Sequence, residues 1–246
     1  MNSDVLRRRG QNHQVGTNER LLQALAEQIK LPLLQIARRA ELARLSSDTS
    51  LVESIELTAD SALRLIDNYL LSTKLARVQN SLQLEPVSIA AVLNETAHEL
   101  SKLAAQYECE LELHLSGRYM PIMAHRAGLE AALTSLGYVF IEAQSIRSHK
   151  HRPVIKLAAH RSKYGIVAGM FADLEGLSRD MYQRGRGLYG HTPQPLTQLV
   201  STSGVGVFVA DSLLKTMSTR LRLAHHQKLS GLAATFTPTN QLSLVQ

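Results

Sequence analysis

Apolar residues recur at every third or fourth position in two stretches that a short polar segment separates. The first stretch carries this seam at Leu22, Leu25, Ile29, Leu33, Ile36, Ala40 and Ala43. The second carries it at Val52, Ile55, Ala59, Ala62, Ile66, Tyr69, Thr73 and Ala76. This spacing places each set on one face of a helix, and the intervening residues 46–50 are good N-cap types. The sequence therefore predicts an antiparallel helical hairpin over residues 18–80.

A lone helical hairpin leaves much of its apolar seam in water. Two copies that form a four-helix bundle would bury it. We therefore expect a homodimer, with contacts through Ile29, Ile36, Ile55, Ile66 and Tyr69. The alternative is a monomer in which the hairpin packs against its own C-terminal domain.

The pattern changes near residue 80, where short strand-like runs alternate with further helical segments. The strand-like runs lie before Pro86 and at 109–115, 153–159, 164–171, 219–226 and 231–237. Helices are expected after Pro86, over 127–145 and over 204–217. Residues 174–200, which are rich in Gly, Pro, Arg and Gln, are expected to form a long loop. Residues 81–246 thus predict an α+β domain with helices on one face of a mixed sheet.

Composition restricts the class of protein. No apolar run approaches the ~18 residues that a membrane span requires. Residues 1–17 are charged and polar without an apolar h-region, so we expect a disordered leader and no signal peptide. The single cysteine, Cys109, excludes an intrachain disulfide and a cysteine-cluster metal site, which fits a reducing cytoplasm.

Charge is divided unevenly between the two halves of the chain. Residues 1–145 hold 14 Lys and Arg against 17 Asp and Glu, whereas residues 146–246 hold 13 against 4. A basic surface can meet nucleic acid, phosphates or an acidic protein. However, four Phe, seven Tyr and no Trp leave few rings to stack on bases. Nucleic acid is therefore not the favoured partner, and a basic nucleic-acid or anion-binding regulator stays an alternative.

Two motifs join these observations. The stretch Ile29-Lys30-Leu31-Pro32-Leu33 fits the second half of a box of the form His-Glu-Ile/Leu-Arg/Lys-x-Pro-Leu, and a Gly-x-Gly sequence opens the late helix at Gly204. With the element order over about residues 18–240, they resemble the transmitter core of sensor histidine kinases. In that family the proline bends the first helix just after the phosphoacceptor histidine. The resemblance implies a dimerising hairpin followed by an α+β sandwich of the histidine-kinase ATPase (GHKL) type.

The residues that carry catalysis in that family differ in this chain. Glu27 stands at the phosphoacceptor position, and a carboxylate does not replace the imidazole nitrogen that this chemistry uses. By the resemblance, Ser135 and Val139 stand at the two asparagine positions of the N-box, the helix whose asparagine holds magnesium. Val139 offers no oxygen to that hard cation. Ala172 stands where an aspartate would bind the adenine amino group.

The remaining candidates are weaker. Glu142 could donate a carboxylate, or it is an ordinary surface residue of its helix. Gly204 and Gly206 resemble the helix opening beneath the ATP phosphates, and they are the candidates for a vestigial cofactor site; close packing of helix on sheet also explains them. His225 and His226 are adjacent in a strand and point to opposite faces, so we expect no metal site.

The coordinated loss of acceptor, magnesium ligand and adenine aspartate predicts a degenerate pseudokinase with no catalytic residue and no Mg-ATP cofactor. It would act as a dimeric docking or regulatory component of two-component-type signalling in the cytoplasm. A receiver-domain protein or another kinase would contact Leu25, Gln28, Lys30, Pro32 and Leu33. The alternative within the same family is a divergent ATP-binding histidine kinase or phosphotransferase.

Overall fold

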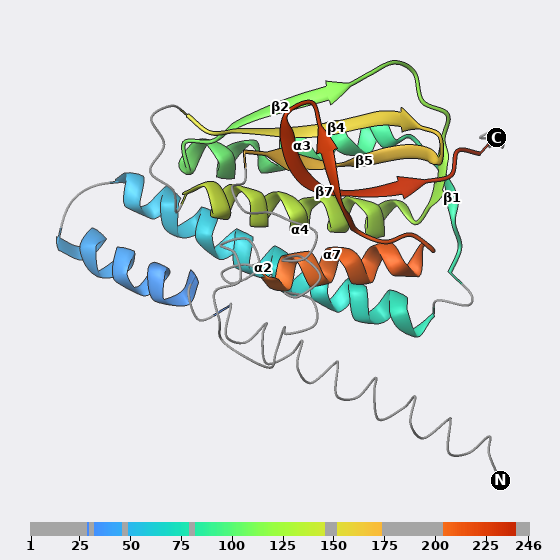
Figure 1. The fold of residues 1–246 in the computed structure, drawn as a ribbon. Helices are drawn as coiled ribbons and strands as arrows, with labels where there is room; N and C mark the ends of the chain where they lie inside the picture. Colours follow the sequence, from blue (N-terminus) through green and yellow to red (C-terminus); the bar gives the residue numbers. More distant parts are fainter. Residues whose placement is uncertain are drawn as a thin grey trace, which may run out of the picture.

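The computed structural model describes residue 29 and residues 32–45, 49–78, 82–145, 152–173 and 204–239. The predicted leader at 1–17 and the predicted loop at 174–200 lie outside these residues, as do Leu25, Glu27, Gln28 and Lys30. Residues 32–45 are helical, and α2 follows at Thr49–Arg77 (Figure 1). Both helices of the predicted hairpin are therefore present, and Pro32 has helical backbone.

The elements that follow form the predicted α+β domain. Its helices are α3 (Ile89–Gln106), α4 (Arg126–Ser145) and α7 (Gly204–Thr216). Two short strands, β1 (Glu85–Val87) and β3 (Ile122–Ala124), pair antiparallel. A five-stranded sheet has the order β2-β4-β5-β7-β6, and only its β2–β4 pair is parallel. Its strands are β2 (Glu110–Leu115), β4 (Val154–Ser162), β5 (Gly165–Ala172), β6 (Arg222–His226) and β7 (Leu229–Phe236).

The main core lies between this sheet and the helices. Alternate residues of β4, namely Ile155, Leu157 and Ala159, are fully buried on the face that the helices cover. The outer face holds a second, smaller cluster around Ala158, Phe171 and Ala233. That cluster forms because the hairpin of β6 and β7 curls over the sheet (Figure 1).

Local side-chain contacts fix the start of α3 and the position of α7. Ser88 caps α3, since its hydroxyl accepts a hydrogen bond of 3.4 Å from the Ala91 amide. In α7, the buried Asp211 carboxylate accepts a hydrogen bond of 3.2 Å from the Leu221 amide and lies 2.8 Å from Lys215 Nζ. This carboxylate ties α7 to the segment that enters β6.

Helix α2 packs lengthwise against the domain, antiparallel to α4. A Cβ at Gly128, near the start of α4, would lie 3.0 Å from Leu75, near the end of α2. Further along, Asn68 of α2 donates hydrogen bonds to α4, and α2 also contacts α7. The hairpin therefore packs on its own C-terminal domain, which is the alternative that the sequence left open. This packing does not exclude a dimer through the other faces of the hairpin.

The stripe of α2 that packs on the domain differs from the predicted seam. Its most deeply buried side chains are Thr58, Leu65, Tyr69, Ser72 and Leu75, of which only Tyr69 belongs to the predicted set. Tyr69 lies in the main core, so it is not free for a dimer contact. The stripe that packs against the domain lies on a different face of the helix from the predicted seam. A search for apolar periodicity overlooks this stripe because it contains small polar residues.

Candidate functional site

The two residues at the N-box positions lie one turn apart on α4 and are closed off from solvent. Ser135 is 0% exposed and Val139 is 1% exposed. The Ser135 hydroxyl accepts a hydrogen bond of 3.0 Å from Asn68 Nδ2 of α2. The same amide donates to the Ala131 carbonyl oxygen at 3.4 Å. Ser135, at one of the two positions that the resemblance assigns to the N-box, is thus engaged by the chain's own hairpin.

Helix α7 closes the same face of α4 from a second direction. A Cβ atom added to Gly206 would lie 2.5 Å from Val139 Cγ2 and 2.9 Å from the Ser135 carbonyl oxygen. Glycine is therefore needed for the α7 backbone to approach α4 this closely. The sequence offered packing of the helix on the sheet as one explanation for Gly206. That explanation is wrong, because the close contact of Gly206 is with α4. Gly204 is the first residue of α7.

The position that the resemblance assigns to adenine binding is also apolar. Ala172, the last residue of β5, is fully buried in the main core. Asp173 follows and is exposed, while its carbonyl oxygen accepts a hydrogen bond of 3.1 Å from Gln144 Nε2. Asp173 thus lies outside the buried core that holds Ala172.

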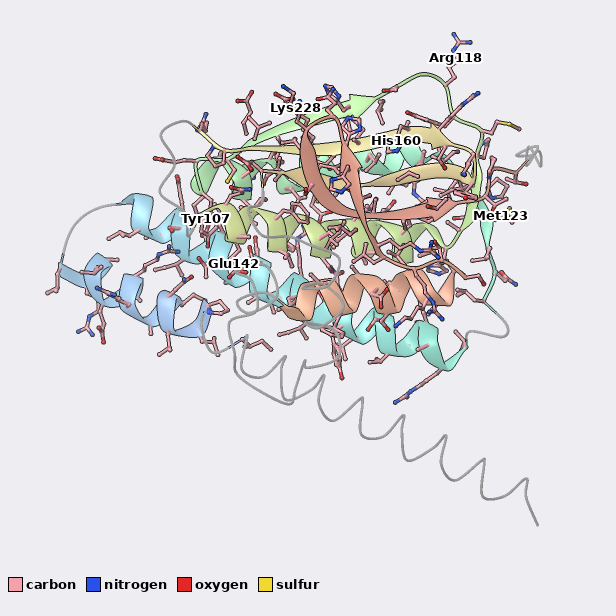
Figure 2. The ribbon with its side chains drawn as sticks, viewed as in Figure 1. Tyr107, Arg118, Met123, Glu142, His160 and Lys228 are labelled. Atoms are coloured by element: carbon pink, nitrogen blue, oxygen red, sulfur yellow. The ribbon has the colours of Figure 1, made fainter. Side chains whose placement is uncertain are left out.

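A cavity lies between the hairpin and the domain, and Ser135, Val139 and Gly206 of the closed face are among the residues that line it. Its volume is about 80 Å³, and five elements line it: segment 32–45, α2, the end of α3, α4 and α7. Its apolar lining consists of Pro32, Ala62, Leu65, Leu103, Val139 and Ile141. Tyr107 and Glu142 lie close together at the cavity (Figure 2).

Glu142 is not the ordinary surface residue that the sequence suggested. It is partly buried and lines the cavity, and burial raises its pKa to about 7. Burial and the nearby Glu142 both raise the pKa of Tyr107. Burial also raises the pKa of Tyr138, which is hydrogen-bonded to Ser61, to about 12. Among the described lining side chains, Glu142 is therefore the one that changes its charge near neutral pH.

A histidine cluster on the outer face of the sheet escaped the sequence analysis. His226 Nε2 lies 3.2 Å from His114 Nδ1, and the ring of His226 stacks on that of His160 at 5.6 Å between centroids. Figure 2 places His160 on the sheet, away from Glu142. Burial, with His160, His114 and Lys156, lowers the pKa of His226. Strand alternation could have placed His114 and His160 on one face, but no sequence signal indicates the curled hairpin that brings His226 to them.

His225 lies on the other side of β6, as the strand pattern predicted. It is exposed, and its Nδ1 is 3.3 Å from Ser230 Oγ. Within the described parts of the chain, no three His, Cys, Asp or Glu residues lie close enough to hold a metal ion. Nor is any described helix both long and apolar enough to cross a membrane.

The hairpin residues predicted to bind partners differ in exposure. Leu33 is 56% exposed, whereas Pro32 lines the cavity. Ile29, Ile36, Ile55 and Ile66 are half-buried. Several other large apolar side chains of the hairpin are well exposed: Leu34, Leu42, Leu45, Val52, Leu63 and Leu70. One side of the hairpin thus packs on the domain while apolar groups remain exposed elsewhere on it.

The described residues at these positions do not fit a magnesium–nucleotide complex. Ser135 is already bonded to Asn68, and Val139 offers no oxygen ligand. Ala172 offers no acceptor to an adenine amino group. The space between α4 and the start of α7 is filled by direct contact at Gly206.

Comparison with known proteins identifies the fold. No family model and no curated protein sequence matches the chain. Among solved structures, the Acinetobacter baumannii histidine kinase AdeS is 15% identical with a TM-score of 0.52, over 86% of this chain and 97% of that one. Histidine kinase ThkA in complex with response regulator protein TrrA is 10% identical with a TM-score of 0.57, over 95% of this chain and 66% of that one. Full-length ShkA in complex with AMPPNP is 18% identical with a TM-score of 0.52, over 90% of this chain and 46% of that one. The predicted fold, a helical region followed by a histidine-kinase-type α/β domain, is confirmed.

Proposed function

We propose that this chain is a catalytically degenerate member of the histidine-kinase-like proteins, which regulates or docks a partner without transferring phosphate. The observation that carries the proposal is the closed N-box face of α4. Ser135 is held by Asn68 of the hairpin, and Val139 meets the backbone of α7 at Gly206. A nucleotide would have to displace two helices to reach this face.

The chemistry of the replaced residues supports the same conclusion. Glu27 stands at the phosphoacceptor position, and its carboxylate is a poor substitute for a nitrogen nucleophile. Val139 and Ala172 remove a metal ligand and an adenine contact. Two lost polar contacts of about 1.5–3 kcal/mol each weaken nucleotide binding by roughly two to four decades.

The hairpin is the proposed docking surface. Its exposed apolar side chains, Leu63 and Leu70 among them, are available to a second copy of the chain while the opposite side of α2 packs on the domain. We propose a homodimer through this surface. ThkA was solved with a response regulator, and we propose a receiver-domain partner here, at the end of the hairpin that carries Pro32 and Leu33. Leu25, Gln28 and Lys30 complete this surface in the proposal.

Incubation with labelled ATP and magnesium tests the loss of catalysis. We expect no acid-labile, base-stable label on the unmodified chain, with an active histidine kinase as the positive control. A Glu27→His variant should also stay unlabelled, because restoring the acceptor does not open the face of α4. Label on a histidine of the unmodified chain would overturn the proposal, and label on the variant alone would show that the nucleotide site is intact.

A further inference from the structure

We propose that the histidine cluster on the outer face of the sheet is a pH-sensitive latch. It consists of His114, His160 and His226, with Gln227 beside them. At neutral pH these side chains hold the turn between β6 and β7 against the opposite edge of the sheet, and in mild acid they release it. The inference goes beyond the proposed function, because it concerns the face of the sheet opposite the helices and requires no partner.

The latch joins two strands that are not neighbours. Strands β2 and β6 form the two edges of the five-stranded sheet. His226 is the last residue of β6, and its Nε2 lies 3.2 Å from Nδ1 of His114 on β2. The amide nitrogen of Gln227 lies 3.4 Å from the same atom. These polar contacts therefore tie the curled turn to the opposite edge (Figure 1).

A chain of hydrogen bonds requires His114 to be neutral while the latch is closed. Lys156 Nζ donates to Gln227 Oε1 at 3.3 Å, so the amide nitrogen of Gln227 faces His114. An amide nitrogen only donates, and His114 Nδ1 must therefore accept. For the 3.2 Å contact to be a hydrogen bond as well, His226 Nε2 must be its donor. A proton on His114 Nδ1 would thus meet two N–H donors.

The other two rings also disfavour a proton. His160 Nδ1 is buried and has no hydrogen-bond partner among the described residues, so a proton there would be an unpaired buried donor. His226 is 8% exposed and stacks on His160. Burial lowers the pKa of His226, and His160, His114 and Lys156 lower it further. The closed latch is therefore most stable without added protons.

The charged groups of the neighbouring strands do not favour a proton on the cluster either. Glu112 of β2 is paired with Lys156 of β4 at 2.9 Å, and Lys156 adds positive charge beside His226. Strands β5 and β7 contain no Asp, Glu, Lys, Arg or His residue. The other such residues of β2, β4, β6 and the turn are all exposed: Glu110, Arg161, Arg222, His225 and Lys228.

The latch covers apolar side chains. The ring of His226 lies 5.3 Å from that of Phe171 between centroids. Phe171 is fully buried, in a cluster with Ala158 and Ala233. When the turn lifts, Phe171 meets water, whereas the main core on the other face of the sheet stays packed. Acid therefore uncovers an apolar patch on the outer face.

Hydroxyl-radical footprinting of the full chain, read by mass spectrometry at pH 7.5 and pH 5.5, tests the latch. The open form takes up the proton more readily, so its population rises as the pH falls below about 6.5. One imidazole changes the ratio of open to closed forms by up to about tenfold between these two pH values. We expect oxidation of Phe171 to rise several-fold in acid. Phe140, fully buried in the main core, is the internal control and should stay protected.

Three variants assign the effect to the latch. His226→Gln removes the titrating ring, so oxidation of Phe171 should be the same at both pH values. Gln227→Glu replaces the amide donor with a carboxylate that favours a protonated His114, so Phe171 should stay protected at pH 5.5. His225→Gln is the matched control, because His225 lies on the other side of β6 beside Ser230. It should keep the full rise in acid.

Four results would overturn the inference. The first is no rise in Phe171 oxidation at pH 5.5, and the second is an equal rise at Phe140, which would indicate general unfolding. The third is the same pH dependence in His226→Gln as in the unmodified chain. The fourth is loss of the rise in His225→Gln, which would place the titrating group outside the cluster.

Discussion

Replacing Gly206 with alanine tests the contact between α7 and α4. The added methyl group would lie 2.5 Å from Val139 Cγ2 and 2.9 Å from the Ser135 carbonyl oxygen. The valine methyl can give way by rotation or small shifts, but the carbonyl oxygen belongs to the α4 backbone. The two helices must therefore separate by several tenths of an ångström, and the contacts on both sides of Gly206 weaken.

The expected cost is the difference between two opposing effects. Overpacking a close-packed interior costs about 1–3 kcal/mol. Alanine in place of glycine within a helix recovers roughly 0.5–1 kcal/mol of backbone entropy. The Gly206→Ala variant should therefore lose about 1–2 kcal/mol of unfolding free energy. For a chain of this size, that lowers the Tm by roughly 2–8 °C.

A double-mutant cycle with Val139→Ala assigns the loss to this contact. Val139→Ala removes the valine methyl groups, so Gly206→Ala should cost less in that background, with a coupling energy of about 0.5–1 kcal/mol. Urea denaturation of the four proteins measures it. If Gly206→Ala were as stable as the unmodified chain, or more so, the glycine would face open space and the closed face would be wrong.

Three other predictions concern the docked hairpin, the dimer and the pH dependence of stability. Asn68→Ala removes the amide that bonds α4, and should cost about 1–3 kcal/mol in urea denaturation; an unchanged midpoint would mean that α2 is not docked. Ile36→Asp together with Ile66→Asp should give a monomer or an aggregate in light scattering, and an unaltered dimer would place the interface elsewhere. The pKa of His226 is lowered on folding, so the unfolded chain takes up the proton more readily and stability should fall as the pH drops below about 6.5; His226→Gln should flatten that decline. Folding raises the pKa of Glu142 from 4.5 to about 7, so the free energy of unfolding should decrease as the pH rises through this range. Glu142→Gln should flatten that decrease. If either variant left the pH dependence of stability unchanged, the pKa shift of that residue would be contradicted.

The order of helices and strands was predictable because each element carries its own period. The alternation over β2 and the long apolar segment of α4 gave nearly the observed bounds. The packing of α2 was not predictable in the same way. Its exposed stripe contains Leu63 and Leu70, whereas the stripe that meets the domain contains Thr58 and Ser72. A pattern of apolar residues cannot show which of these two stripes packs on the domain, since small polar side chains also pack well between helices.

At the candidate site, the loss of a magnesium ligand at Val139 and of an adenine acceptor at Ala172 stays a prediction from the resemblance. Val139 and Ala172 exclude an oxygen ligand and an adenine acceptor whatever their surroundings. The environment of Glu142 was not predictable, because its burial depends on segment 32–45 and α2, which are distant in sequence. The histidine cluster likewise depends on a curl of the β6–β7 hairpin, which brings the two edges of the sheet together.

Binding of MgATP tests the central claim, the closure of the α4 face at Ser135 and Val139. The measurement is the Tm of the full chain with and without 1 mM ATP and magnesium, repeated with ATP and a chelator. An ordinary micromolar site at 100 times its Kd or more gains at least about 2.7 kcal/mol, which raises the Tm by roughly 5–10 °C. The closed face predicts no magnesium-dependent change in Tm. A shift of several degrees at submillimolar ATP, abolished by the chelator, would contradict the account and favour an active nucleotide-binding kinase.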